Sequence, residues 1–149
     1  MAKRILLVEN EKNLARFVSL ELQKESFLVD LAETGQEGLA LAKDVDYDLL
    51  LLNYDLQDMT ASDFAKQLSL IKPASVIIVL ASREEIADQQ EAIQHFAVSY
   101  VVKPFIISDL VERVSIIFRG RDFIDQHCSL LKIPTSYRNL RVDIKNHTV

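Results

Sequence analysis

The stretch Leu49-Leu50-Leu51-Leu52-Asn53 decides the fold of this chain. Its four apolar residues are too few for a helix and do not alternate with polar ones, so they predict a strand buried on both faces. Such strands belong to parallel sheets that carry helices on both sides. Asn53 ends the apolar run, which places it at the carboxyl end of the strand, where folds of this kind hold their ligands.

Apolar runs and helical patterns alternate on both sides of this stretch. Four more strands are predicted at residues 5–8, 27–31, 76–80 and 100–102. Helical spacing is found in Leu14, Phe17, Val18 and Leu22, in residues 35–43, in Phe64, Leu68 and Ile71, and in Ile86, Gln90 and Ile93. Ser108 is predicted to cap a fifth helix. This alternation predicts an α/β fold, a flavodoxin-like doubly wound sheet of five parallel strands.

The composition is that of a globular domain in a reducing compartment. Of the 149 residues, 49% are hydrophobic and 26% are charged, and the net charge of −5 does not favour nucleic-acid binding by these residues themselves. The apolar runs are too short for a signal peptide or a membrane span, so we expect a cytoplasmic protein with no membrane partner. The single cysteine, Cys128, cannot form an internal disulfide.

Three segments at the predicted strand ends resemble the receiver domain of two-component response regulators. Residues 6–11 are similar to its acidic opening, residues 52–56 to its phosphoacceptor segment, and residues 100–105 to its final strand and lysine. The resemblance implies a CheY-like receiver at residues 1–119. Residues 137–143 resemble the first strand of the winged-helix domain of the OmpR/PhoB subfamily. We therefore expect an interdomain linker helix at 120–136 and the start of a truncated DNA-binding domain at 137–149.

The resemblance also implies a degenerate phosphoacceptor pocket. Its predicted members are Glu9, Asn10, Asn53, Ala81 and Lys103. An amide at position 53 lacks the charge and the free lone pair with which a carboxylate attacks phosphorus. Two carboxylates of the family's Mg²⁺ site are replaced by amides, so neither a metal nor another cofactor is expected. Lys103 is expected to pair with Glu9 or with the amide of Asn53.

One further position in the final strand has a family role. Tyr100 lies three residues before Lys103 and matches the family's switch aromatic. With no phosphoryl group to move it, the ring is expected to keep one packed position.

The sequence after the receiver carries a heptad-like apolar pattern. It comprises Leu110, Val114, Ile117, Arg121, Ile124, Cys128 and Leu131. Two interpretations remain open. In the first, the fifth helix packs its first half on the sheet and the rest is a connector. In the second, the helix extends beyond the receiver and its seam meets another chain or domain. Cys128 is a candidate redox switch, and its alternative is an inert buried thiol.

Two functional hypotheses follow from these patterns. The first is a phosphorylation-independent transcriptional regulator, a repressor by resemblance, that binds DNA through the full-length C-terminal domain. It is expected to form a homodimer, disulfide-linked through Cys128. The second is a receiver-like module that docks a regulatory protein and binds no DNA. We do not expect an enzyme, because no glycine-rich loop follows the first strand and neither Ser82 nor Cys128 has an evident base.

Overall fold

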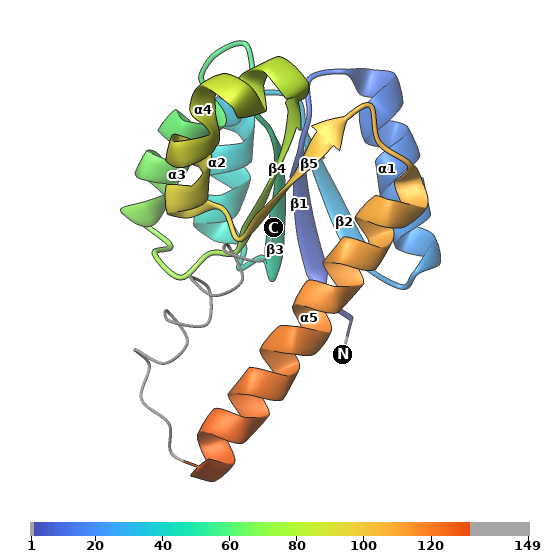
Figure 1. The fold of residues 1–149 in the computed structure, drawn as a ribbon, viewed down its shortest axis with the longest axis vertical. Helices are drawn as coiled ribbons and strands as arrows, with labels where there is room; N and C mark the ends of the chain where they lie inside the picture. The colour runs from blue at the N-terminus through green and yellow to red at the C-terminus, as the bar shows by residue number, and fades with distance from the viewer. Residues whose placement is uncertain (1, 132–149) are drawn as a thin grey trace. The chain divides into compact units, whose positions relative to one another are not determined.

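The computed structural model describes residues 2–131, with side chains described for residues 2–120. Within that range the chain forms five strands and five helices in strict alternation (Figure 1). They are β1 (Arg4–Val8), α1 (Lys12–Lys24), β2 (Leu28–Ala32), α2 (Gly35–Asp44), β3 (Leu49–Asn53), α3 (Ala61–Ser69), β4 (Ile77–Ser82), α4 (Arg83–Phe96), β5 (Ser99–Lys103) and α5 (Ile107–Leu131). The predicted CheY-like receiver fold is confirmed.

The sheet is parallel and its strand order is β2-β1-β3-β4-β5. The chain adds β2 on one side of β1 and then returns to place β3 on the other side, so the order reverses at β1. In Figure 1, α1 covers one face of the sheet, and α2, α3 and α4 cover the other. The carboxyl ends of β1 and β3 therefore meet at the point where doubly wound folds bind their ligands.

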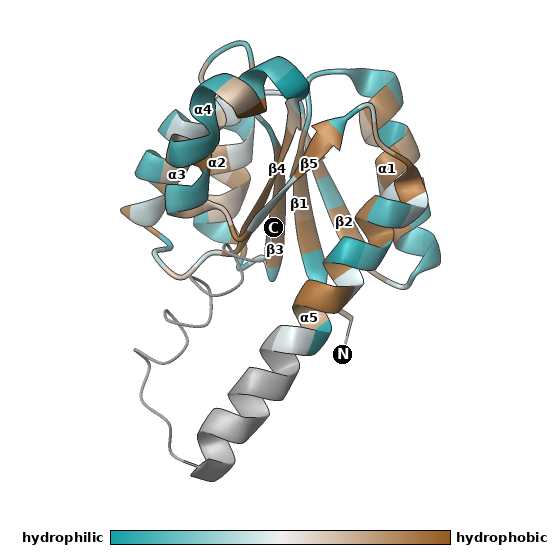
Figure 2. Cartoon of the chain, viewed as in Figure 1, coloured by the Kyte–Doolittle hydropathy of each residue, from teal (hydrophilic) through white to brown (hydrophobic). Residues whose placement is uncertain are grey.

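The core forms because β3 is apolar on both faces. All five of its residues are buried, and Leu52 is aligned with Val8 of β1 and Val79 of β4. On the α2 and α3 side, Leu52 and the fully buried Phe64 belong to one apolar cluster. Figure 2 shows the same pattern, with apolar strands inside and polar residues on the outer helix faces.

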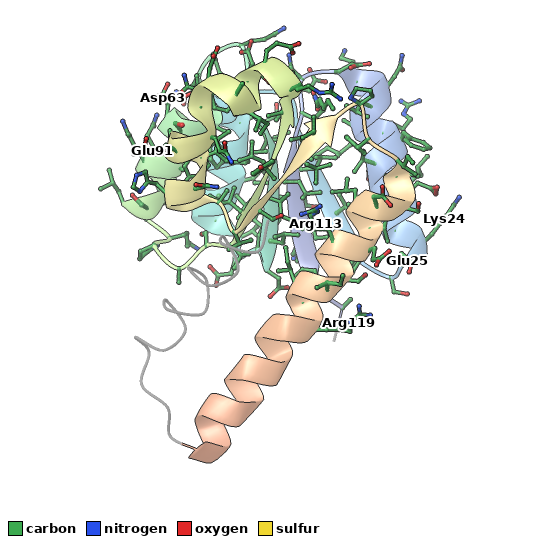
Figure 3. The ribbon with its side chains drawn as sticks, viewed as in Figure 1. Lys24, Glu25, Asp63, Glu91, Arg113 and Arg119 are labelled. Atoms are coloured by element: carbon green, nitrogen blue, oxygen red, sulfur yellow. The ribbon has the colours of Figure 1, made fainter. Side chains whose placement is uncertain are left out.

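Capping side chains fix the starts of α3 and α4. Thr60 and Asp63 form a reciprocal capping box at α3, and Ser82 and Glu85 form another at α4. Asp63 is labelled at the surface in Figure 3.

Within α4, Gln89 has a non-helical backbone, with φ −122° and ψ 15°. None of the helices in the described residues combines the length and apolarity needed to cross a membrane.

Two details of the sequence prediction are wrong. Ser108 does not cap α5, because that helix already begins at Ile107. Ile71 lies beyond the end of α3 and is 42% exposed. Phe17 and Gln90 lie in α1 and α4, as their spacing predicts, and both are exposed. Phe17 is 49% exposed because residues 15, 18, 19 and 22 form the buried face of α1.

The chain divides into two compact units, Met1–Phe105 and Ile106–Val149. In the second unit, the backbone of α5 is helical without interruption to Leu131, through Gly120 and position 128. The backbone is therefore helical along the whole apolar pattern, and what the seam meets stays a prediction. The seam side chains from Arg121 onward, and the predicted start of a winged helix, lie outside the described side chains. The domain boundaries after residues 119 and 136 remain predictions.

Gly38 lets α2 pack closely against Val8 of β1 and Phe64 of α3, where a larger residue would not fit. A Cβ there would lie 2.8 Å from Cγ2 of Val8 and 3.0 Å from Cε2 of Phe64, both fully buried. We expect Gly38→Ala to destabilise the protein by about 1–3 kcal/mol in urea melts, although alanine is the better helix former. Gly35→Ala is the control and should cost less, because the atoms that it would meet belong to the flexible Met59 side chain. A Gly38→Ala variant more stable than the parent would contradict this packing.

Candidate functional site

Four polar side chains gather at the carboxyl ends of three strands. Glu9 and Asn10 follow β1, Asn53 ends β3, and Lys103 ends β5. The parallel sheet brings these residues together although 94 positions separate Glu9 from Lys103. The structure thus places four of the five predicted pocket residues in one hydrogen-bonded group.

Lys103 lies at the centre of this group. Its Nζ donates to Oε1 of Glu9 at 2.8 Å and to Oδ1 of Asn53 at 2.9 Å, so it makes both of the contacts that the sequence left open. The Glu9 side chain is 1% exposed and that of Lys103 is 25% exposed. A nearly buried carboxylate is stable only with a matched partner, and here the ammonium group supplies it.

The amide of Asn53 uses both of its ends. Its oxygen accepts from Lys103, while its nitrogen donates to Oδ1 of Asn10 and to the main-chain oxygen of Asp55, each at 2.8 Å. An ionised carboxylate has no donor and could not make the last two bonds. The surroundings of position 53 are therefore built for an amide.

Ala81 and Tyr100 do not join this hydrogen-bonded group. Ala81 is fully buried in the apolar cluster, and Tyr100 is a half-buried ring packed against the same cluster. The hydroxyl of the adjacent Ser82 accepts from the backbone N–H of Glu85, so it serves as the cap of α4. Ala81 and Tyr100 therefore contribute packing to the core, and Ser82 contributes a helix cap.

The residues present do not fit a divalent cation. Mg²⁺ prefers several anionic oxygen ligands, and Glu9 is the one carboxylate in the group. Its Oε1 is taken by Lys103, and its Oε2 accepts from the backbone N–H of Glu11 at 3.1 Å. In the described part of the chain, no three histidine, cysteine or acidic residues form a group that could hold a metal ion.

Asp58, in the loop that follows Asn53, makes a structural contact that the sequence did not reveal. From the loop after β3, its carboxylate accepts from the backbone N–H of Gly35 at 2.8 Å and of Gln36 at 2.9 Å. It thereby ties the loop that follows Asn53 to the first turn of α2. The sequence shows only an acidic loop residue, and no local pattern connects positions 22 or 23 residues apart.

The contact of Asp58 predicts a pH-dependent stability. Burial raises the pKa of this carboxyl, but hydrogen bonds from backbone N–H groups, led by those of Gln36 and Gly35, together outweigh burial, so the pKa is lower than usual. The stabilisation is therefore complete above the ordinary value of about 3.9 and is lost as the pH falls through the folded-state value. Asp58→Asn should cost about 0.5–1 kcal/mol in urea melts at neutral pH and nothing at about pH 2. Asp44→Asn, at the opposite end of α2, is the control and should not destabilise. Equal effects of the two variants would refute the contact.

The fold and these strand-end residues define a response regulator receiver. The family model described as "Response regulator receiver domain" matches residues 5–115, and the chain belongs to that family. Response regulator ArlR of Staphylococcus epidermidis is 36% identical over 124 residues, which are 81% of this chain and 56% of ArlR. Cell cycle response regulator CtrA of Brucella ovis is 34% identical over 116 residues, 78% of this chain and 50% of CtrA. The chain spans about half the length of these relatives.

Solved structures give a more specific likeness. The chain is 58% identical to the inactive form of the regulatory domain from the repressor of iron transport regulator (RitR), with a TM-score of 0.77, covering 81% of this chain and 98% of that one. It is 60% identical to a structure described as "A novel family of redox sensors in the streptococci evolved from two-component response regulators", with a TM-score of 0.82. That match covers 89% of this chain and 58% of the other.

Proposed function

We propose that this chain is the regulatory part of a transcription regulator that works without phosphorylation. The observation that carries the proposal is the Lys103 ammonium, which bridges Glu9 and Asn53. In this arrangement the lysine satisfies the acidic residue of the pocket, with no need for an incoming metal or phosphoryl group. The pocket is then a structural element that holds the receiver in one state.

Three further features support a single state. The amide of Asn53 is bonded at both ends, and Tyr100 is packed against the core. Ala81 has no hydroxyl, and the hydroxyl of Ser82, the last residue of β4, is engaged as the cap of α4. A receiver is switched when a ligand binds one conformation better than another. A pocket with no nucleophile and no metal site has no such ligand, so the signal enters elsewhere.

The output is DNA binding through a domain that follows the receiver and linker. The support is the match to about half of ArlR and CtrA, which are response regulators, together with the likeness to RitR, which is described as a repressor. In this proposal residues 1–119 are the receiver, residues 120–136 the linker, and residues 137–149 the start of the DNA-binding domain.

The signal in this proposal is oxidation of Cys128. The continuous backbone of α5 carries this residue beyond the receiver, and structures of RitR variants named C128D and C128S have been solved. Peroxide oxidises one thiolate to a sulfenic acid and releases water or hydroxide. The thiol of a second chain then displaces a second water to give the disulfide. Joining two chains raises the effective concentration of the second DNA-binding domain at paired half-sites.

Peroxide treatment of the full-length protein tests this function. We expect a dimer on non-reducing gels that dithiothreitol reverses and that Cys128→Ser lacks. Binding to paired half-sites should change with oxidation in the parent and stay constant in the variant. Peroxide-independent DNA binding by both proteins would remove the redox role and keep the regulator. No specific DNA binding in any redox state would leave the second hypothesis, a module that docks a regulatory protein.

A further inference from the structure

A groove of about 290 Å³ lies at the end of the sheet opposite Asn53. Its walls come from the end of α2, the start of β3, the end of α3 and the loop before β4, all within the first unit of the chain. The inner surface is apolar and includes Ala42, Val45, Leu50 and Leu68. The groove shares no residue with the pocket around Lys103.

Hydrogen bonds hold the walls of this groove in place. The Tyr47 hydroxyl donates to Asp30 at 2.7 Å, and Asp30 also lies 3.5 Å from Nε of Arg4. The main-chain oxygen of Lys72 accepts from both the N–H and the hydroxyl of Ser75, at 3.2 and 2.8 Å. Ligand sites in proteins are usually preformed in this way, with apolar walls and a few fixed polar groups.

The polar groups at the mouth differ in their contact with water. Lys72 and Asp46 form an ion pair in which the lysine side chain is 30% exposed and the aspartate side chain is 90% exposed. An exposed pair contributes little to stability, so Asp46 is readily exchanged for another anion. The lysine stays at the wall when its partner leaves, because most of its side chain is covered. The mouth therefore favours an incoming anion over an incoming cation.

From these features we propose that the groove binds a small monocarboxylic acid. The apolar body of the ligand packs against Val45 and Ile71, over the buried Leu50 and Leu68. Its carboxylate replaces Asp46 at the Lys72 ammonium. The volume lies at the small end of the range for ligand pockets and suits a chain or ring of about six carbons. This proposal does not rest on DNA binding or on the oxidation of Cys128, so a negative result for either leaves the proposed ligand site unaffected.

Titration of the ¹⁵N-labelled chain with hexanoate tests the proposal. We expect saturable amide shifts centred on residues 42–50 and 68–75, with a Kd on the order of 1 mM. Hexanol and hexylammonium should bind about tenfold more weakly, because neither can pair with Lys72. Equal binding of all three probes, or shifts centred on other residues, would overturn the assignment.

Two variants test the charged and the apolar part of the site separately, and a third is the control. Lys72→Met removes the ammonium and keeps the apolar stem, and should weaken hexanoate binding about tenfold. Lys66→Met, on the exposed face of α3, should leave it unchanged. Ala74→Phe fills the mouth from an exposed position and should abolish binding of every probe. Hexanoate binding that survives both Lys72→Met and Ala74→Phe would place the ligand elsewhere.

Discussion

Lys103→Met is expected to destabilise the protein by about 3–5 kcal/mol, because it leaves a buried charge without its partner. Glu9 is 1% exposed and its Oε1 lies 2.8 Å from the ammonium that the variant removes. The same change takes away the donor to Oδ1 of Asn53. Equilibrium urea unfolding, monitored by circular dichroism, measures the loss.

A matched surface pair provides the control. Lys12 lies 3.9 Å from Glu33, and their side chains are 78% and 57% exposed, so Lys12→Met should cost between about 0 and 1 kcal/mol. The double variant Glu9→Gln with Lys103→Met should regain most of the stability lost by the single one, since it removes both charges. If the Lys103 and Lys12 variants lose similar amounts, the Lys103 pair is solvated and does not lock the pocket.

The sequence predicts the sheet well because the strand signal is local. The run 49–52 is apolar on both faces, and such runs occur mainly in parallel sheets, so the alternation of strands and helices follows from the positions of the apolar residues along the chain. Local spacing does not determine which apolar side chains near or within a helix are buried. Phe17 and Ile71 are apolar residues at or near helical spacing, and their exposure depends on which face the neighbouring elements cover.

The candidate site is only partly predictable for the same reason. Motif resemblance locates Glu9, Asn53 and Lys103, and charge suggests that the lysine has a partner. The two donor bonds of the Asn53 amide depend on distances that no spacing in the sequence encodes. The link from Asp58 to α2 is hidden because it joins a loop to the first turn of a helix that only the folded sheet brings near it.

Phosphorylation chemistry should return only when both the nucleophile and the cation site are rebuilt. We expect no phosphoryl adduct on the unmodified chain after incubation with acetyl phosphate and Mg²⁺. Asn53→Asp restores the attacking carboxylate, but Asn10 still provides a neutral oxygen where the cation needs an anionic one. Little labelling is therefore expected from this single variant.

The double variant Asn10→Asp with Asn53→Asp is the decisive comparison. Together with Glu9, the two new aspartates give three carboxylates around the Lys103 ammonium. Mg²⁺ can then compete with the ammonium for their oxygens and neutralise charge as the phosphoryl group transfers. Intact mass spectrometry should show more adduct on the double variant than on either single variant, and peptide mapping should place it at residue 53. Asp55→Asn in the same background controls for labelling of the neighbouring carboxylate. Efficient labelling of Asn53→Asp alone would show that Lys103 and Glu9 already suffice. An adduct within residues 50–60 of the unmodified chain would disprove a phosphorylation-independent pocket.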